Sequence, residues 1–391
     1  MTQRKTMATK TGVNRLILIG NGFDLAHGLK TGYNDFIIWY LNQAFDQAQR
    51  NHLYEDELMT VSVRDVHALR ALRAPEVDTV EAFIDHFYQE GFDKMIGQPR
   101  LKFPGWGNDY HNPFETRIKS NLLSLLLGNC SSAKWVDIEN TFYDLLKGSL
   151  TGTREEEKNL LVADLNKSLS VLISHLEAYL KTINTDVTVK GYDELLNSPF
   201  NPSDFIDKEF QDRDKHYLKS TYVLNFNYTS TVEKYITRRN PLEAPMEVNY
   251  IHGKLGEKDN PIIFGFGDEL DKDYAGFELE RAKGIFEYIK SFWYFRTSNY
   301  HNLIRFIDDS PYQIFILGHS CGLSDRTMLN MVFEHENCKS VKIFYYQNGS
   351  FNNYTPITQE ISRHFSNKQQ MRKKIIPFDR STPMPQANTP Q

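Results

Sequence analysis

Residues 16–29 read LILIGNGFDLAHGL, and this stretch predicts a buried strand that ends at glycines and continues as a helix. Glycines at the carboxyl end of a strand let backbone N–H groups approach a phosphate, and the positive end of the next helix favours an anion. The dinucleotide fingerprint would place a third glycine at position 25, which is Leu25. The motif therefore predicts a ligand at this turn and leaves its identity open.

Further strand signals lie late in the chain, at residues 221–226, 248–252, 261–265, 313–318 and 341–345. They are continuous apolar runs, which favour a parallel sheet covered on both faces. We therefore predict an α/β fold with a Rossmann-like, mostly parallel sheet. The predicted domain spans residues 13–365, with a large, mainly helical insertion at 45–215. Residues 366–391 have no apolar period, so we expect a disordered tail.

The composition narrows the class of protein. The chain has 391 residues, 40% of them apolar, and a net charge of -5, which predicts a globular protein and argues against nucleic-acid binding. No stretch approaches the roughly 18 apolar residues of a membrane span. The three cysteines form no CxxC pair and the twelve histidines form no HxxxH pair with a carboxylate, so we expect neither a metal site nor disulfides. We predict a cytoplasmic protein without a membrane partner.

Polar residues and glycines follow five of the predicted strands. Ligands of open parallel sheets gather at the carboxyl ends of the strands, so these residues are predicted to share one site. They are Gly20, Asn21, Gly22, Phe23 and Asp24; Asn225, Asn227 and Tyr228; His252 and Gly253; residues 265–267; and Gly318, His319 and Ser320.

His252 and Asn227 are the candidate catalytic residues. A histidine at a strand end can act as a general base near neutral pH, although a hydrogen-bonded structural histidine is the commoner outcome. Asn227 can bind a ribose hydroxyl or a water molecule, but by residue type a capping role is favoured. Thr229 or Ser230 is well placed to start the next helix.

Two further features leave alternatives open. Residues 318–322 read GHSCG after an apolar strand, which is the form of a serine hydrolase nucleophile elbow at Ser320. Against that interpretation, Asp325 follows too closely and lies at a predicted N-cap, and no histidine completes a triad. Asp24 would repel a phosphate. It is expected to cap a helix, bind a ribose hydroxyl or face a developing cation.

The motifs resemble those of the bacteriophage abortive infection AbiH family. The similarity covers about residues 14–346 and implies a role in phage defence, in which the infected cell stops growing or dies. The matching segments are residues 18–29 with Thr31, Tyr33 and Phe36; residues 135–139; residues 225–229; residues 251–253; and residues 317–320 with Asp325.

The order of these motifs is also similar to that of sirtuin-like NAD-consuming domains. This resemblance implies that Asn227 contacts ribose or water, that His252 is the base, and that Gly318 and Ser320 hold ribose. The sequence departs from that pattern at the first turn and at Thr229, and it lacks the zinc cysteines of deacetylating sirtuins. The resemblance therefore implies NAD cleavage rather than deacylation.

We thus predict an antiphage effector that uses NAD as its substrate and hydrolyses the nicotinamide–ribose bond, with Asp325 among the NAD-binding residues. Two alternatives remain. The protein could be a nucleotide-binding sensor that acts through a phage trigger or a second copy of itself, or a hydrolase with Ser320 as its nucleophile. The trigger and the oligomeric state are not encoded in any recognisable motif.

Overall fold

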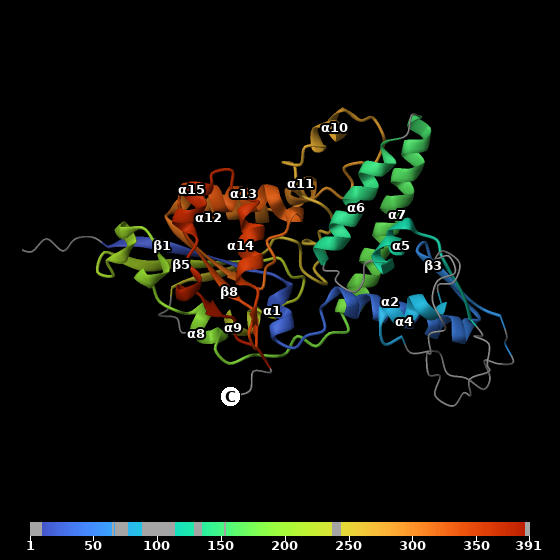
Figure 1. Ribbon diagram of the computed structural model, residues 1–391, viewed down its shortest axis with the longest axis horizontal. Coiled ribbons are helices and arrows are strands. Elements are labelled where there is room, and N and C mark those ends of the chain that lie inside the picture. The colour runs from blue at the N-terminus through green and yellow to red at the C-terminus, as the bar shows by residue number, and fades with distance from the viewer. Residues whose placement is uncertain are drawn as a thin grey trace, which may run out of the picture. The chain divides into compact units, whose positions relative to one another are not determined.

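The computed structural model describes residues 10–64, 66, 77–87, 114–128, 135–151, 154–236 and 244–387 (Figure 1). The chain divides into two compact units. The first, here called the sheet unit, comprises Met1–Lys30, Ile183–Asp271 and Lys290–Gln391. The second unit comprises Thr31–Thr182 and Lys272–Ile289.

A six-stranded parallel sheet forms the centre of the sheet unit. Its strands lie in the order β11-β8-β7-β1-β5-β6, and each neighbouring pair is parallel. Numbered along the chain, this is the order 3-2-1-4-5-6 read from β6, which is that of dinucleotide-binding folds. The predicted α/β class is confirmed. The strands are β1 (Thr11–Ile19), β5 (His216–Asn225), β6 (Met246–Tyr250), β7 (Tyr312–Leu317), β8 (Cys338–Tyr345) and β11 (Thr382–Pro383).

Helices cover both faces of this sheet, which is why its central strands are apolar on both sides (Figure 1). Leu16 and Leu18 of β1 pack with α12 (Asn299–Asp309), α13 (Arg326–Glu334) and α14 (Tyr354–Ser362). Ile17 and Ile19 pack on the other face with α1 (Asn21–Ala26), α8 (Tyr192–Leu196) and α9 (Glu233–Ile236). The remaining elements of this unit are α11 (Lys290–Trp293), α15 (Lys368–Lys374), the small hairpin β9 (Gln347–Asn348) and β10 (Phe351–Asn352), and the 3-10 turns η1 (Pro202–Asp204), η2 (Lys208–Gln211), η3 (Tyr294–Arg296), η4 (Leu323–Asp325) and η5 (Phe378–Arg380).

Two segments of the sheet unit differ from the expectation. The predicted strand at 261–265 is wrong, because this segment is irregular and is joined to the strand ends by a hydrogen bond from the Ile263 N–H to the His252 carbonyl (2.8 Å). The expected tail contains α15 and β11, and Thr382 and Pro383 pair with the edge strand β8. Met384 then packs into the core. Residues 388–391 of the tail lie outside the described residues.

The second unit contains long helices and a small antiparallel sheet in the order β2-β3-β4. The sequence predicts an insertion at 45–215 and does not predict this sheet. Within the described residues, no helix combines the length and the apolar character needed to cross a bilayer. The elements are α2 (Tyr33–Asn51), β2 (Leu53–Glu55), β3 (Met59–Val63), α4 (Val80–Phe87), β4 (Phe114–Ile118), α5 (Asn121–Gly128), α6 (Trp135–Ser149), α7 (Glu155–Leu180) and α10 (Tyr274–Leu279).

A half-buried carboxylate holds the turn between β2 and β3. Asp56 accepts hydrogen bonds from the hydroxyls of Tyr54 (2.5 Å) and Tyr40 (2.9 Å), and from the backbone N–H of Met59 (2.8 Å). Its Oδ2 lies 3.1 Å from Nε2 of His175 in α7. Burial raises the pKa of Asp56, but these hydrogen bonds outweigh it and lower the pKa to about 2. The turn is thereby tied to both α2 and α7.

Candidate functional site

The candidate site lies where the direction of the sheet reverses. The chain runs from β1 to β5 and β6 on one side and then crosses to β7 on the other side of β1. In open α/β sheets, ligands bind beyond the carboxyl ends of the strands at this point. The turns after β1 and β7 meet there: the Gly22 N–H donates to the Gly318 carbonyl (2.9 Å) and the Gly20 N–H to the Leu317 carbonyl (3.2 Å).

The glycines allow these two turns to touch. A Cβ atom on Gly22 would lie 2.8 Å from Cα of Gly318, and one on Gly318, where φ is +71°, would lie 2.1 Å from the Phe23 nitrogen. The sequence analysis assigns the first glycines to a phosphate, yet here the protein's own backbone fills the space beside them. The Phe23 N–H also donates to the Gly20 carbonyl (2.9 Å). Three amides of the predicted phosphate cradle, those of Gly20, Gly22 and Phe23, therefore already have protein partners.

Asp325 is the centre of a buried polar cluster. It ends η4 and occupies the N-cap position of α13, but its side chain makes no capping hydrogen bond. Instead Oδ1 accepts a hydrogen bond from Lys290 Nζ (2.9 Å) and lies 3.0 Å from His252 Nε2. The lysine is fully buried and the other two side chains are buried as well. The N-cap role expected for Asp325 is thus replaced by an ion pair and a histidine contact.

Electrostatics fix the protonation of this cluster. Burial raises the pKa of Asp325, but the positive charge of Lys290 and the contact with His252 outweigh it and hold the pKa well below its usual range. An ionised carboxylate only accepts hydrogen bonds, so Nε2 of His252 is the donor, and in the neutral imidazole Nδ1 then carries the lone pair. Within the described residues, Nδ1 of His252 makes no hydrogen bond. That nitrogen is the atom able to accept a proton from a ligand.

Aromatic rings surround His252 beyond the end of β6. The Tyr294 hydroxyl lies 3.1 Å from its Nε2, and the ring of Phe226 meets its imidazole edge to face at 5.1 Å. Gly253 follows with a φ of +83°, and a Cβ there would lie 2.0 Å from the Pro261 carbonyl oxygen. Gly253 is therefore required by the return of the chain at Pro261, whereas the sequence analysis placed it beside the substrate.

His319 lies against the same carboxylate from the β7 side. Its Nδ1 accepts a hydrogen bond from the Cys321 N–H (3.0 Å), and its Nε2 lies 4.0 Å from Asp325 Oδ2. Burial lowers its pKa to about 4 although Asp325 favours the charged form. His319 is thus neutral near pH 7. The described residues hold no group of three histidine, cysteine or carboxylate side chains arranged to bind a metal ion.

The asparagine segment after β5 joins the cluster to the first turn. Asn227 donates from Nδ2 to the Gly20 carbonyl (3.0 Å), and its backbone N–H donates to Asn225 Oδ1 (3.0 Å). Asn225 in turn donates to the Thr229 carbonyl (3.3 Å), and the Tyr228 hydroxyl to the Ile263 carbonyl (3.2 Å). Oδ1 of Asn227 makes no hydrogen bond in the described structure. It is therefore open to a hydroxyl or a water molecule.

Asp24 is buried within α1 and does not cap it. Its Oδ2 accepts a hydrogen bond from Thr229 Oγ1 (2.5 Å), while no described atom bonds to its Oδ1. Burial raises the pKa of Asp24 to about 6 despite hydrogen bonds from threonine and asparagine side chains. Thr229 therefore holds Asp24, whereas the sequence analysis expected it to start the helix that follows β5.

The contacts around Ser320 do not form a hydrolase elbow. Its side chain is exposed and makes no hydrogen bond within the described residues. The left-handed backbone conformation falls on Cys321, with a φ of +54°, and not on Ser320. The downstream histidines are engaged elsewhere, His335 with Asp308 (3.0 Å) and His364 with the Cys321 carbonyl (2.7 Å).

The structure thus places His252 and His319 beside the carboxylate of Asp325, and it links Asn227 to the first turn. Sequence reasoning missed Lys290, because its partner Asp325 lies 35 residues further along the chain. The one signal was a lysine two residues before the aromatic run at residues 292–295.

Comparison with known protein families identifies the chain's relatives. The family model described as bacteriophage abortive infection AbiH matches residues 16–347. This range includes the whole polar cluster and the strands that carry it. A search of curated proteins found no match.

Proposed function

Because this chain belongs to the bacteriophage abortive infection AbiH family, which implies a role in abortive infection, we propose that it binds NAD or a related nucleotide and hydrolyses the nicotinamide–ribose bond. The observation that carries this proposal is the pair of His252 and Asp325, held at the switch point of a parallel sheet. A histidine oriented by a buried carboxylate is the arrangement of a general base.

The proposed reaction uses the two unpaired acceptors of the site. The bond between C1′ of the ribose and the nicotinamide nitrogen breaks, and its electron pair leaves with nicotinamide. A water oxygen bonds to C1′ while His252 Nδ1 takes the proton of that water. The ionised Asp325 stabilises the resulting imidazolium, and Lys290 keeps the carboxylate charged. Asn227 Oδ1 accepts a hydrogen bond from the water or a ribose hydroxyl and orients it.

The nicotinamide and ribose end of the nucleotide would bind beside His252 and Asn227, and no binding site is proposed for its diphosphate. The Gly22 and Phe23 amides, which the sequence analysis gave to the phosphates, have protein partners. The similarity of motif order to sirtuin-like domains supports the assignment of Asn227 and His252. Positioning and general-base catalysis together can supply several kcal/mol of barrier reduction.

Nicotinamide release from NAD, followed by chromatography, tests the proposal. We expect release by the wild type and a loss of about 10²–10⁴-fold on His252→Ala, the range typical of a general base. Asn227→Ala should also slow release. His301→Ala is the matched control, because this histidine is exposed and lies outside the cluster. No release by the wild type, or unchanged release by both site variants, would refute the mechanism.

One observation favours a second candidate, a nucleotide sensor without turnover. The side chains of the cluster are buried, and the glycine turn bonds to the neighbouring turn. A site that is closed in this way can hold a ligand without admitting the attacking water. Saturable NAD binding by calorimetry, with no nicotinamide released, would favour the sensor over the hydrolase.

A further inference from the structure

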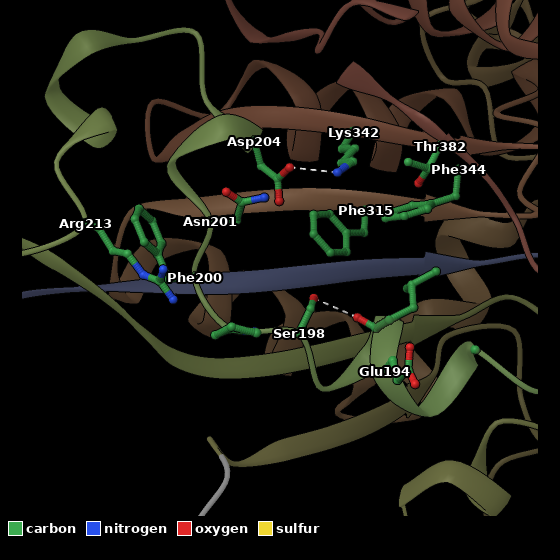
Figure 2. A pocket seen from close by; sticks show the side chains of 13 residues that line it. Glu194, Ser198, Phe200, Asn201, Asp204, Arg213, Phe315, Lys342, Phe344 and Thr382 are labelled. Carbon is green, nitrogen blue, oxygen red and sulfur yellow. Dashed lines mark hydrogen bonds and ion pairs between the residues drawn. The ribbon is translucent and has the colours of Figure 1, made fainter. Parts of the chain in front are cut away.

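A second cleft lies on the sheet face, away from the polar cluster (Figure 2). It lies between the strands β7, β8 and β11 and the segment 191–204, and it shares no residue with the candidate site. Its volume of about 440 Å³ falls within the usual range of small-molecule sites, ~300–1,000 Å³. Phe315 and Phe344 lie in its wall, with their ring centroids 5.0 Å apart.

The buried cationic side chains around this cleft already have protein partners. Lys342 donates to Asp204 Oδ1 (2.7 Å), as the dashed line in Figure 2 shows. Arg15, under the cleft, donates to the carbonyls of Ser198 (2.6 Å) and Pro199 (3.2 Å) and lies 4.4 Å from the ring centre of Phe315. These contacts fix the segment 198–204 against the sheet. The inner wall is therefore a preformed surface whose polar groups already have protein partners.

The groups left without partners are mostly hydrogen-bond donors. Arg213 is exposed, and within the described residues its guanidinium makes no ion pair or hydrogen bond. The Thr382 hydroxyl is likewise unengaged. Asn201 accepts a hydrogen bond from the Ser203 N–H (3.1 Å) through Oδ1, which leaves its amide NH₂ available. Glu194 is the one unpaired carboxylate of the lining, and Figure 2 draws it well apart from Arg213.

We propose that this cleft binds a small organic anion with a flat apolar body. The body lies against Phe200, beside which Figure 2 draws Arg213, and a carboxylate or phosphate group pairs with Arg213. Guanidinium groups bind both kinds of oxyanion through paired hydrogen bonds. The Asn201 amide is an additional donor. Glu194, on the far side, disfavours a second anionic group and thereby selects ligands with one charged end.

Calorimetric titration of the full chain with four probes tests this proposal. Benzoate and phenyl phosphate carry both features, benzyl alcohol lacks the charge, and inorganic phosphate lacks the body. We expect one or both of the first two to bind saturably, at least about tenfold more tightly than the other two. Whichever of the first two binds more tightly identifies the charged group. Equal binding by all four probes, or saturable binding by none, overturns the proposal.

Variants locate the binding site. Arg213→Gln should weaken binding of the charged aromatic probe by about tenfold or more, which corresponds to about 1.4 kcal/mol. Arg372→Gln, at an exposed arginine of α15, is the matched control and should leave it unchanged. His252→Ala should bind the probe like the wild type, so the result is independent of NAD hydrolysis. An unchanged affinity in Arg213→Gln would show that the anion binds elsewhere.

Discussion

Replacement of Lys290 by methionine tests whether this buried lysine holds Asp325 ionised. The substitution keeps the length and apolar stem of the side chain and removes the ammonium group 2.9 Å from Asp325 Oδ1. Lys290 is fully buried and Asp325 nearly so, so solvent screens their interaction very little. Loss of one partner of a buried ion pair costs about 3–5 kcal/mol, because the other charge stays buried without compensation.

This loss should be visible in thermal unfolding. For a unit of 150–250 residues, 1 kcal/mol changes Tm by about 2–4 °C, so Lys290→Met should lower Tm by about 6–20 °C. Circular dichroism at pH 7 measures it, with Lys373→Met as the control at an exposed lysine of α15. Because the pKa of Asp325 is lowered in the folded protein, the ion pair stabilises the fold above about pH 4, and this stabilisation is lost as the pH falls further. The deficit of the variant should shrink in the same range.

A double substitution separates the ion pair from packing. Lys290→Met together with Asp325→Asn removes both charges, so it should be more stable than Lys290→Met alone. The reasoning is refuted if the double variant is no more stable than the single one, or if Lys290→Met unfolds within about 2 °C of the wild type.

Three further substitutions probe other contacts. Asp24 has a folded pKa raised to about 6, so its carboxyl stabilises the fold below about pH 4 and loses that effect as the pH rises to 6. Asp24→Asn should therefore gain Tm relative to the wild type between about pH 4 and pH 6, and a constant difference over that range would contradict this. Asp56, with a pKa of about 2, stabilises above about pH 4; Asp56→Asn should cost about 1–3 kcal/mol at pH 7 in urea unfolding, and less as the pH falls towards 2. Gly318→Ala should unfold far more easily, and so lose more soluble protein, than Gly256→Ala. Both positions have positive φ, but only at Gly318 do backbone atoms occupy the place of the Cβ. Equal losses of soluble protein in the two variants would show that the strain of a positive φ alone matters.

The sheet was predictable because burial on both faces leaves a local signal. The apolar runs that became β1, β5, β6, β7 and β8 can be recognised without knowledge of their neighbours. The same signal misled at 261–265, where Ile263 is buried in the core without joining the sheet. An apolar run reports burial, and strand pairing depends on partners that are distant in sequence. Strand β11 escaped prediction because it has only two residues.

The candidate site was predictable as a set of strand ends, but its contacts were not. The contact of Thr229 with Asp24 joins residues 205 positions apart, and neither residue type announces it. Residue type suggested an N-cap for Asp325, and only the fold brings Lys290 to it. The glycines after β1 were predicted to let a phosphate approach closely, and the group that approaches them in the structure is the turn at Gly318.

The position of β1 in the middle of the sheet sets the timing of folding during synthesis. β1 ends at residue 19, but its neighbours β5 and β7 begin at residues 216 and 312. At about 5–20 residues per second, β7 follows β1 by roughly 15–60 s. Until β5 is made, about 10–40 s after β1, both edges of this apolar strand are unpaired, and one edge stays unpaired until β7 follows. Asp325 is made after β1, β5, β6 and β7, so the polar cluster is completed only once these four strands exist.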